Sequence, residues 1–336
     1  MRIKLWAVVA ILLLPSAITP RAGGATGHNV KSAVDQSDAV EARIRQVTES
    51  LLPAVQIKGR SNAMNLADQM SHYHIPGVSV AVINEGRIEW ARGFGVKDAS
   101  TKEPVTAETL FQAGSISKPV AAAAALHLVQ EGKLDLDENV NDKLKSWKVP
   151  DNEHTEKKKV TLRELLSHTA GLTVHGFPGY AADAPLPTLV QVLDGTKPAN
   201  TAPIRVDIDP GSEWRYSGGG YTVMQQMLID VTGKPFPEIL NDAVLSPVGM
   251  TESSYEQPLP ESWQGRTATA HRNGAPIKGR WHIYPEMAAA GLWTTPSDLA
   301  RFAIEIQRSF EGQSNKVLSA SMTKLMLTPV LQNYGL

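Results

Sequence analysis

The stretch Gly114-Ser115-Ile116-Ser117-Lys118 stands just before an alanine-rich segment, Ala121 to Leu128, that is typical of a buried helix. Residues three apart on a helix lie on one face, so Ser115 and Lys118 are expected to be neighbours. A lysine whose pKa is lowered by burial can take the proton of a serine hydroxyl. Gly114 permits a tight turn before the pair. The stretch therefore predicts an activated nucleophile, with Ser115 as the attacking group and Lys118 as its base.

The spacing alone is not specific, because the chain holds a second copy, Ser321 to Lys324. That copy lies in an amphipathic stretch with no glycine before it and no alanine run after it, and we interpret it as a surface helix. For Ser115 the structural alternative is a plain helix N-cap, a position that serine favours. The rest of the sequence has to decide between these two interpretations.

The composition is that of an ordinary globular protein. The 336 residues are 42% hydrophobic and 20% charged, with a formal net charge of -1. This balance of charges provides no positive field for nucleic acid, so no nucleic-acid partner is expected. The chain contains no cysteine, which excludes both a disulfide framework and a lipid-carrying cysteine.

Residues 1–25 have the layout of a signal peptide. A basic start, Met1 to Lys4, precedes the apolar run Leu5 to Leu14, and small residues follow. This run is too short to span a membrane, and no later stretch is long enough, so no membrane span is expected after signal removal. We therefore expect a periplasmic or secreted protein, with a linker over residues 26–39 and the folded domain over residues 40–336. An uncleaved amphipathic N-terminus is the alternative.

The periodicity of the domain predicts an α+β fold. Two apolar runs, Val78 to Ile83 and Ile88 to Phe94, flank Asn84-Glu85-Gly86 and predict an antiparallel hairpin. Since the first run is almost entirely apolar, we expect it in a larger sheet that is covered on both faces. Val40 to Ser71 is compatible with one long helix, and roughly residues 130–280 form a helix-rich region. The clearest helical segments are Val120–Glu131, Leu162–Ser167, Thr222–Thr232 and Pro296–Gln307.

Tyr216 lies in a second segment that holds a candidate reactive side chain. The turn Asp209-Pro210-Gly211 precedes it, and Gly218-Gly219-Gly220 follow it and leave the phenol uncrowded. An ammonium group beside a tyrosine stabilises phenolate and lowers the tyrosine pKa from its usual value of about 10. Tyr216 is therefore a candidate to relay a proton from Ser115. The structural alternative is a buried tyrosine whose hydroxyl caps a loop.

Four motifs in this order carry a resemblance to a known family. They are Ser115-Ile116-Ser117-Lys118, Leu165-Leu166-Ser167-His168-Thr169-Ala170-Gly171-Leu172, Pro210-Gly211 leading into Tyr216-Ser217-Gly218, and Ala290-Gly291-Leu292-Trp293-Thr294-Thr295-Pro296-Ser297-Asp298-Leu299. Together they resemble the serine β-lactamase and penicillin-binding-protein superfamily from about Ile75 to Leu336. Within it, they resemble the class C branch of D-alanyl-D-alanine carboxypeptidases, D-aminopeptidases and family VIII carboxylesterases.

The resemblance implies a β-lactamase/transpeptidase-like fold and an acyl-enzyme mechanism. Ser115 would attack a carbonyl, Lys118 and Tyr216 would shuttle the proton, and water would release the acyl group. Tyr216 would also protonate the leaving group, and the Ser115 backbone amide would be the first oxyanion donor. His168 belongs to a structural loop motif in these relatives. No metal and no cofactor are expected, and the partner is a small ester, peptide or β-lactam substrate.

Gly218 departs from the family pattern. The second motif of the family usually ends in asparagine, which helps to hold the lysine and contacts the amide side chain of β-lactams, and here that substrate-binding position is Gly218. Glycine offers no side-chain donor. The departure shifts the expectation towards ester or peptide substrates without excluding slow acylation by penicillins.

The third motif of the family, Lys-Thr-Gly or His-x-Gly, has no counterpart before the last residues, Tyr334-Gly335-Leu336. In relatives its strand lines the site, supplies a second oxyanion donor and pairs with further strands against the N-terminal hairpin. The expectation is a C-terminally truncated domain without these sheet strands. Loss of an oxyanion donor costs on the order of a hundredfold to a thousandfold in rate, so this form is expected to be inactive or poorly folded.

Three function classes stay open at this point. The first is an exported serine hydrolase that cleaves an ester, amide or D-amino-acid peptide through acyl-Ser115. The second is a β-lactamase or D-alanyl-D-alanine carboxypeptidase of peptidoglycan metabolism, and the third is a non-catalytic penicillin-binding-like sensor or binding module.

Other hydrolase classes find no support in the sequence. It contains neither the Gly-x-Ser-x-Gly elbow of α/β-hydrolases nor a zinc-binding His-Glu-x-x-His, and His72 and His74 are interpreted as surface residues. Four aromatic residues are candidates for cleft walls, although ordinary core packing would explain them equally well: Trp214, Phe177, Tyr180 and Tyr284.

Overall fold

The predicted hairpin is present as strands β2 (Gly77–Asn84) and β3 (Arg87–Gly95). The two strands pair antiparallel, with Val80 opposite Arg92. Glu85 and Gly86 connect them, and both have positive φ angles, 50° and 70°. Two successive positive φ angles match the right-handed twist of a tight hairpin, which is why glycine suits the second position. The prediction of an antiparallel hairpin is confirmed.

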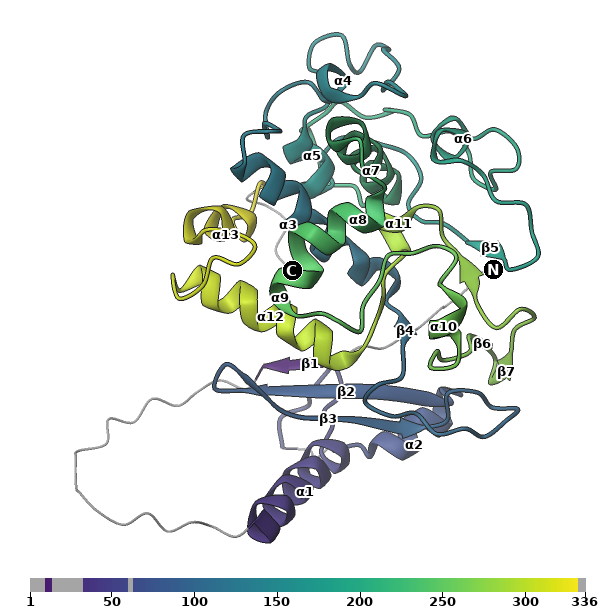
Figure 1. The fold of residues 1–336 in the computed structure, drawn as a ribbon, viewed down its shortest axis with the longest axis vertical. Coiled ribbons are helices and arrows are strands. Elements are labelled where there is room, and N and C mark those ends of the chain that lie inside the picture. Colours follow the sequence, from purple (N-terminus) through teal and green to yellow (C-terminus); the bar gives the residue numbers. More distant parts are fainter. Residues whose placement is uncertain (1–9, 14–32, 60–62, 332–336) are drawn as a thin grey trace, which may run out of the picture.

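Helices cover both faces of this hairpin, as predicted (Figure 1). On one face, α12 (Pro296–Phe310) packs its Ala300 against Ala81 and Ile83 of β2. On the other face, Ile44 of α1 (Ala33–Glu49) lies in a cluster with Trp90 of β3 and the three valines of β2, at positions 78, 80 and 82. A strand covered on both faces buries consecutive residues instead of alternate ones, which explains the continuous apolar run.

The computed structural model describes residues 10–13, 33–59 and 63–331. The predicted signal peptide, residues 1–25, lies outside the described residues except for β1 (Ala10–Leu13). This strand pairs parallel with Val80–Ile83 of β2. Helix α1 begins at Ala33, inside the stretch predicted as a linker over residues 26–39.

The prediction of one long helix from Val40 to Ser71 is wrong. Helix α1 ends at Glu49, and a second helix, α2 (Leu66–His72), starts only after an intervening segment. That segment contains Pro53, whose ring cannot continue a helix. Its ends are held together by backbone hydrogen bonds between Leu51 and Met64.

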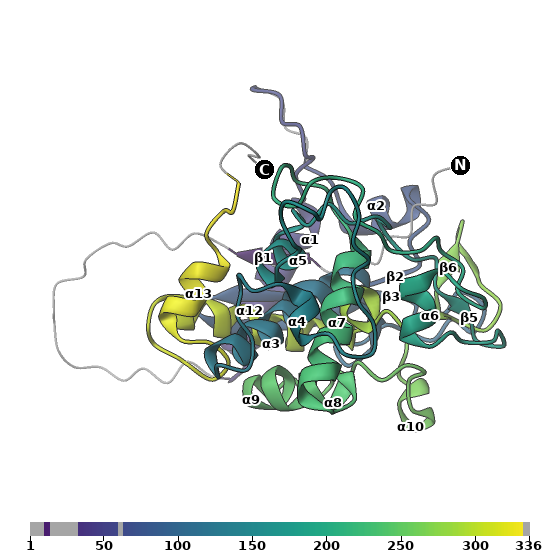
Figure 2. The same cartoon turned by 90° about the horizontal axis from the view of Figure 1, so that it is seen from above.

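The largest hydrophobic core lies in the helical half of the molecule, above the sheet in Figure 1. Its centre is α3 (Ser117–Gln130), in which Val120 to Leu126 are all buried. Small alanine side chains allow neighbouring helices to approach closely. Helix α7 (Gly218–Thr232) packs beside α3, and α5 (Leu162–Ser167) packs on α7 (Figure 2). These three helices and α12 match the four segments predicted from periodicity.

Shorter elements complete this helix-rich half. The helical ones are the 3-10 turn η1 (Gly114–Ile116), α4 (Val140–Lys143), α6 (Leu189–Asp194), α8 (Phe236–Leu240), the π-helical turn η2 (Asn241–Leu245), α9 (Ser246–Val248), α10 (Glu261–Gln264), α11 (Met287–Ala290) and α13 (Ala320–Met326). The strands form two-residue pairs: β4 (Phe111–Gln112) with β9 (Trp293–Thr294), β5 (Tyr180–Ala181) with β8 (His282–Ile283), and β6 (His271–Arg272) with β7 (Ala275–Pro276). Across the described ranges, no helix is both long and apolar enough to cross a membrane.

Candidate active site

Ser115 lies on the turn η1, which leads directly into α3. Gly114 has a φ of +53°, a left-handed conformation that suits glycine, so the turn exposes the Ser115 side chain. The N-cap of α3 is Ile116, and no side chain caps this helix. The interpretation of Ser115 as a plain N-cap is therefore wrong. The neighbouring Ser117 is buried, and its hydroxyl donates to the carbonyl of Gly114 at 2.6 Å.

Lys118 lies beneath Ser115 and is 5% exposed. Its Nζ is 3.1 Å from Ser115 Oγ and donates to the carbonyl oxygen of Ala289 at 2.7 Å. Burial favours the uncharged amine and lowers the pKa of Lys118 to about 7. A substantial fraction of the lysine is therefore neutral at neutral pH and able to accept a proton, and it makes the contact with Ser115 that the spacing predicts.

Tyr216 approaches Ser115 from a different part of the chain, the segment before α7. Its hydroxyl donates to Ser115 Oγ at 2.8 Å. Burial raises the pKa of Tyr216, and the hydrogen bond to Ser115 only partly opposes this. The expectation that a nearby ammonium would lower this pKa is wrong: the Lys118 amine lies 5.0 Å from the ring centroid, but burial is the largest influence and raises the pKa of Tyr216. Tyr216 is thus a protonated phenol that can donate a hydrogen bond, while the neutral Lys118 amine can accept a proton.

Two histidines flank the ring of Tyr216. The ring centroid of His168 lies 4.3 Å from that of Tyr216, and the centroid of His175 lies 4.8 Å away. His168 Nδ1 accepts the backbone N–H of Ser217 at 3.2 Å. Burial and the charge of Lys118 lower the pKa of His168 to about 4, so its imidazole is neutral at neutral pH. Both histidines support the position of Tyr216, which agrees with the structural role expected for His168.

Gly218 is the first residue of α7 and is buried. The sequence predicts that it contacts substrate, but Gly218 is not among the residues that line the cavity, whereas its neighbour Phe177 is. A Cβ atom added at Gly218 would lie 3.0 Å from Cε2 of Phe177 and 3.1 Å from the carbonyl oxygen of His175. Ser115, Lys118 and Tyr216 are brought together in the fold, whereas Gly218 lies behind the cavity wall.

The three reactive side chains open into a cavity of about 680 Å³. Two of the aromatic residues named from the sequence, Phe177 and Tyr284, lie in its wall, whereas Trp214 and Tyr180 do not. The lining residues are Gln112, Ala113, Gly114, Ser115, Ile116, Lys118, Pro119, Leu166, His168, Gly176, Phe177, Tyr216, Tyr221, Tyr284, Ala289 and Ala290. This wall contains no Asp, Glu or Arg side chain, so apart from Lys118 it is uncharged at neutral pH.

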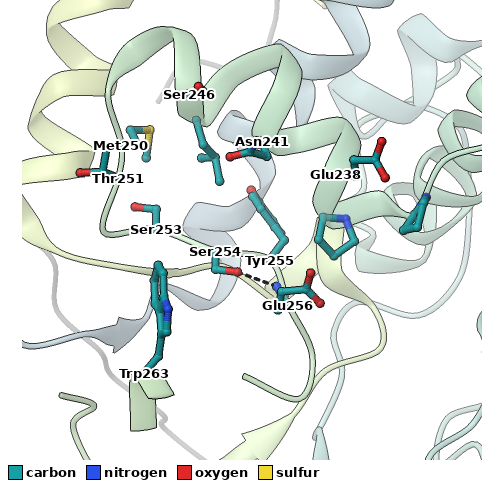
Figure 3. Close-up of a pocket in the computed structure, with 13 residues that line it drawn as sticks. Glu238, Asn241, Ser246, Met250, Thr251, Ser253, Ser254, Tyr255, Glu256 and Trp263 are labelled. Atoms are coloured by element: carbon teal, nitrogen blue, oxygen red, sulfur yellow. Dashed lines mark hydrogen bonds between the residues drawn. The ribbon is translucent and has the colours of Figure 1, made fainter. Parts of the chain in front are cut away.

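A second cavity, of about 600 Å³, lies beside α8 and η2 (Figure 3). Tyr255 forms part of the cavity wall, and the Tyr255 hydroxyl donates to the backbone carbonyl of Ser117 at 2.6 Å. The cavity wall holds Ser246, Ser253 and Ser254 but no lysine or histidine that could activate a serine. The first cavity is therefore the candidate active site. Tyr255 helps to fix the start of α3 through its hydrogen bond to Ser117.

One functional group could not have been found from side chains in the sequence. The Ala289 carbonyl, which fixes the Lys118 amine, belongs to the backbone of α11, and only the motif around Ala290 pointed to this region. Within the described part of the chain, no cluster of three His, Asp or Glu side chains is placed to hold a metal ion.

The fold and the Ser–Lys–Tyr arrangement define the class of β-lactamase and penicillin-binding-protein-like serine hydrolases. The Beta-lactamase family model matches residues 63–334, and the chain belongs to this family. It is 29% identical over 273 residues to "Penicillin-binding protein 4" of Amycolatopsis lactamdurans, an alignment that covers 76% of this chain and 66% of that protein. It is 25% identical to "Protein flp" of Staphylococcus aureus strain N315, covering 67% of this chain and 42% of that protein.

Solved structures show the same fold. The octameric penicillin-binding protein homologue from Pyrococcus abyssi aligns with a TM-score of 0.62 and 25% identity, covering 78% of this chain and 58% of that one. EstCE1, described as a hydrolase with promiscuous acyltransferase activity, aligns with a TM-score of 0.63 and 22% identity, covering 87% and 77%. The chain spans about two thirds or less of the length of these curated relatives.

Proposed function

We propose that this protein is an exported serine hydrolase that forms an acyl-enzyme on Ser115 and hydrolyses an ester, amide or D-amino-acid peptide. One observation carries the proposal: Ser115 Oγ is contacted at once by the Lys118 amine, at 3.1 Å, and the Tyr216 hydroxyl, at 2.8 Å. A serine so placed has a base to accept its proton and an acid to serve the leaving group. Export rests on the layout of residues 1–25.

In the proposed acylation step, Ser115 Oγ attacks the carbonyl carbon while its proton passes to the neutral Lys118 amine. The Ser115 backbone N–H stabilises the oxyanion. Tyr216 donates its phenolic proton to the leaving oxygen or nitrogen, the bond to the carbonyl carbon breaks, and Lys118 returns a proton to Tyr216. Water then attacks the acyl-enzyme through the same groups and regenerates Ser115.

The lining of the cavity favours neutral esters among these substrates. Lys118 is the one lysine among the lining residues, and its amine is already engaged by Ser115 and the Ala289 carbonyl. A substrate carboxylate would therefore meet no uncommitted cationic side chain in the described wall. An uncharged ester carries no such desolvation cost.

A β-lactamase or D-alanyl-D-alanine carboxypeptidase of peptidoglycan metabolism is the second candidate. The likeness to a protein named penicillin-binding protein 4, at 29% identity, favours it. A non-catalytic sensor or binding module is the third. The complete Ser–Lys–Tyr contact argues against it, because a binding module has no need of a deprotonated lysine beside a serine.

Covalent labelling tests the proposal. The purified chain is exposed to a fluorophosphonate and, separately, to a penicillin, and its intact mass is measured for the wild type, Ser115→Ala and Ser321→Ala. Ser321 is a matched control because it belongs to the second Ser-x-x-Lys copy, on the exposed face of α13. We expect one phosphonyl adduct that is lost in Ser115→Ala and kept in Ser321→Ala.

The other outcomes separate the candidates. A long-lived penicillin adduct on Ser115, or rapid penicillin turnover, would favour the second candidate. A folded wild-type sample that reacts with neither reagent would contradict both enzymatic candidates and leave the binding module.

A further inference from the structure

The loop before Phe177 lies directly against the first turn of α7. The backbone N–H of Gly218 donates to the carbonyl of His175 at 3.1 Å, and that of Gly219 donates to Val174 at 3.0 Å. The Ser217 hydroxyl donates to the carbonyl of Thr173 at 2.8 Å. Three successive residues at the start of one helix thus hold three carbonyls of the loop, so the backbone that leads into Phe177 is fixed against α7.

Glycine at position 218 is what allows the Phe177 ring to lie there. A Cβ at Gly218 would be 3.0 Å from Phe177 Cε2 and 3.5 Å from Cδ2, and carbon atoms in ordinary contact are about 3.5 to 4.0 Å apart. A side chain growing from position 218 would therefore enter the space that the ring fills. Phe177 and Gly218 form a size-matched pair, in which the large residue is on the loop and the small one on the helix.

Phe177 is part of an apolar wall in the cavity. Ile116, Leu166 and Phe177 are each half-buried, pack on the main hydrophobic core and line the cavity. Tyr284 adds a nearly buried ring to the same lining. Apolar surface that remains accessible in a cavity gains free energy when an apolar ligand group covers it.

We propose that Phe177 is a specificity-determining residue, whose ring binds the acyl chain of the substrate and selects neutral esters of aliphatic acids such as butanoic and hexanoic acid over acetates. This inference rests on the proposed acyl-enzyme function and names its substrate class. The acyl chain is the group concerned because it stays attached to Ser115 after the leaving group has departed, so its contact with the apolar wall lasts through both steps.

The test compares kcat/KM for p-nitrophenyl acetate, butanoate and hexanoate in the wild type and in Phe177→Ala. We expect the wild type to prefer the longer chains and the hexanoate-to-acetate ratio to fall about tenfold in the variant, since methylene groups in an apolar pocket discriminate by roughly this factor or more. Phe310→Ala is the matched control, because Phe310 is an exposed residue at the end of α12. Its ratio is expected to equal that of the wild type.

The pairing with Gly218 gives a second, independent readout. In the wild-type background, Gly218→Ala displaces the Phe177 ring and lowers the hexanoate-to-acetate ratio. In the Phe177→Ala background, the same substitution has no ring to displace and leaves the ratio as it is. Additive effects in this double-mutant cycle would overturn the pairing.

Two further results would overturn the specificity role. One is an unchanged ratio in Phe177→Ala, and the other is a change confined to esters that differ in their alcohol part. Failure of the underlying function looks different: neither ester turnover nor Ser115 labelling by fluorophosphonate would occur in the wild type. Circular dichroism and the melting temperature confirm that each variant is folded.

Discussion

The proposed role of Lys118 as a base depends on where its side chain ends. The amine lies in a buried position and has two oxygen neighbours, Ser115 Oγ and the Ala289 carbonyl, neither of which carries a charge. An ammonium ion there loses most of its hydration without gaining a counter-ion. The neutral amine is consequently favoured, and the pKa falls from 10.5 to about 7.

The pH dependence of turnover follows from this pKa. Acylation requires the neutral amine, so kcat/KM for a neutral ester is expected to rise with pH through about 7 and then level off. Lys118→Ala is expected to lower kcat/KM by about 10²- to 10⁴-fold, the usual contribution of a positioned base. The measurement is a pH–rate profile from pH 5 to 9, a range that brackets this pKa.

Lys324→Ala is the control for that experiment, since Lys324 is exposed and belongs to the second Ser-x-x-Lys copy. Its profile should overlay that of the wild type. A wild-type profile that is flat through pH 7 would contradict the assignment of Lys118 as the base.

The Ser115–Lys118 contact could be predicted because it depends on local helix spacing. The pKa of Tyr216 could not, because the sequence shows a possible cation nearby but not the burial that raises this pKa. Phe177 was a candidate for the cleft wall, but its close approach to Gly218 was hidden. Glycine at position 218 marks such an approach only once the neighbour is known.

At the scale of an element, the short helix α11 carries a buried acid at its start. Glu286 is fully buried, and neither of its carboxyl oxygens has a hydrogen-bond partner in the described part of the chain. Burial raises its pKa from 4.5 to about 7, and the opposing effects of its own backbone amide and of the nearby Tyr180 hydroxyl are smaller. Gln225 of α7 holds the same turn through the Pro285 carbonyl and the Ala288 amide.

The stability of the protein should therefore depend on the ionisation of Glu286. Because the folded-state pKa is raised, the contribution of this group is fully present below pH 4.5 and is lost as the pH rises through about 7. Glu286→Gln keeps the shape of the neutral acid and cannot ionise. At pH 8 the free energy of unfolding of this variant is expected to be about 3 kcal/mol higher than that of the wild type.

Urea unfolding at several pH values measures this difference. The exposed Glu261→Gln serves as control, for which no such pH-dependent gain is expected. A constant difference between the wild type and Glu286→Gln from pH 5 to 8 would show that the carboxyl is not protonated in the folded state.

The elements themselves were predictable where their signals are local. The β2–β3 hairpin has two apolar runs around a turn, and α3, α5, α7 and α12 have clear periodicity. The break between α1 and α2 was missed because scattered apolar residues suggested continuity, while Pro53 and the Leu51–Met64 pairing end it. The short strand pairs depend on contacts between distant segments, which periodicity does not reveal.

At the scale of the whole molecule, α12 joins the two halves. It packs on β2 through small side chains, with Ala300 fully buried against Ala81 and Ile83. The other side of α12 contacts α9 and α13. Close packing at Ala300 thus sets the distance between the sheet and the helical half that carries the candidate active site.

Ala300→Leu should force this interface apart. Inserting extra methylenes into a packed core typically costs about 1 to 3 kcal/mol, so a lower melting temperature is expected. Gln307→Leu introduces the same side chain at an exposed position of the same helix and should leave the melting temperature nearly unchanged. Differential scanning calorimetry of the two variants checks the prediction, and equal melting temperatures would refute it.

The groups around Ser115 come from three segments that are far apart in the chain. Tyr216 lies 101 residues from Ser115, and Ala289 lies 171 residues from Lys118. Contacts of such long sequence separation close large loops and form slowly. Ser115 should thus gain its reactivity only when folding is nearly complete. The rate at which Ser115 becomes reactive towards a fluorophosphonate in a refolding sample would then report the rate of the last steps of folding.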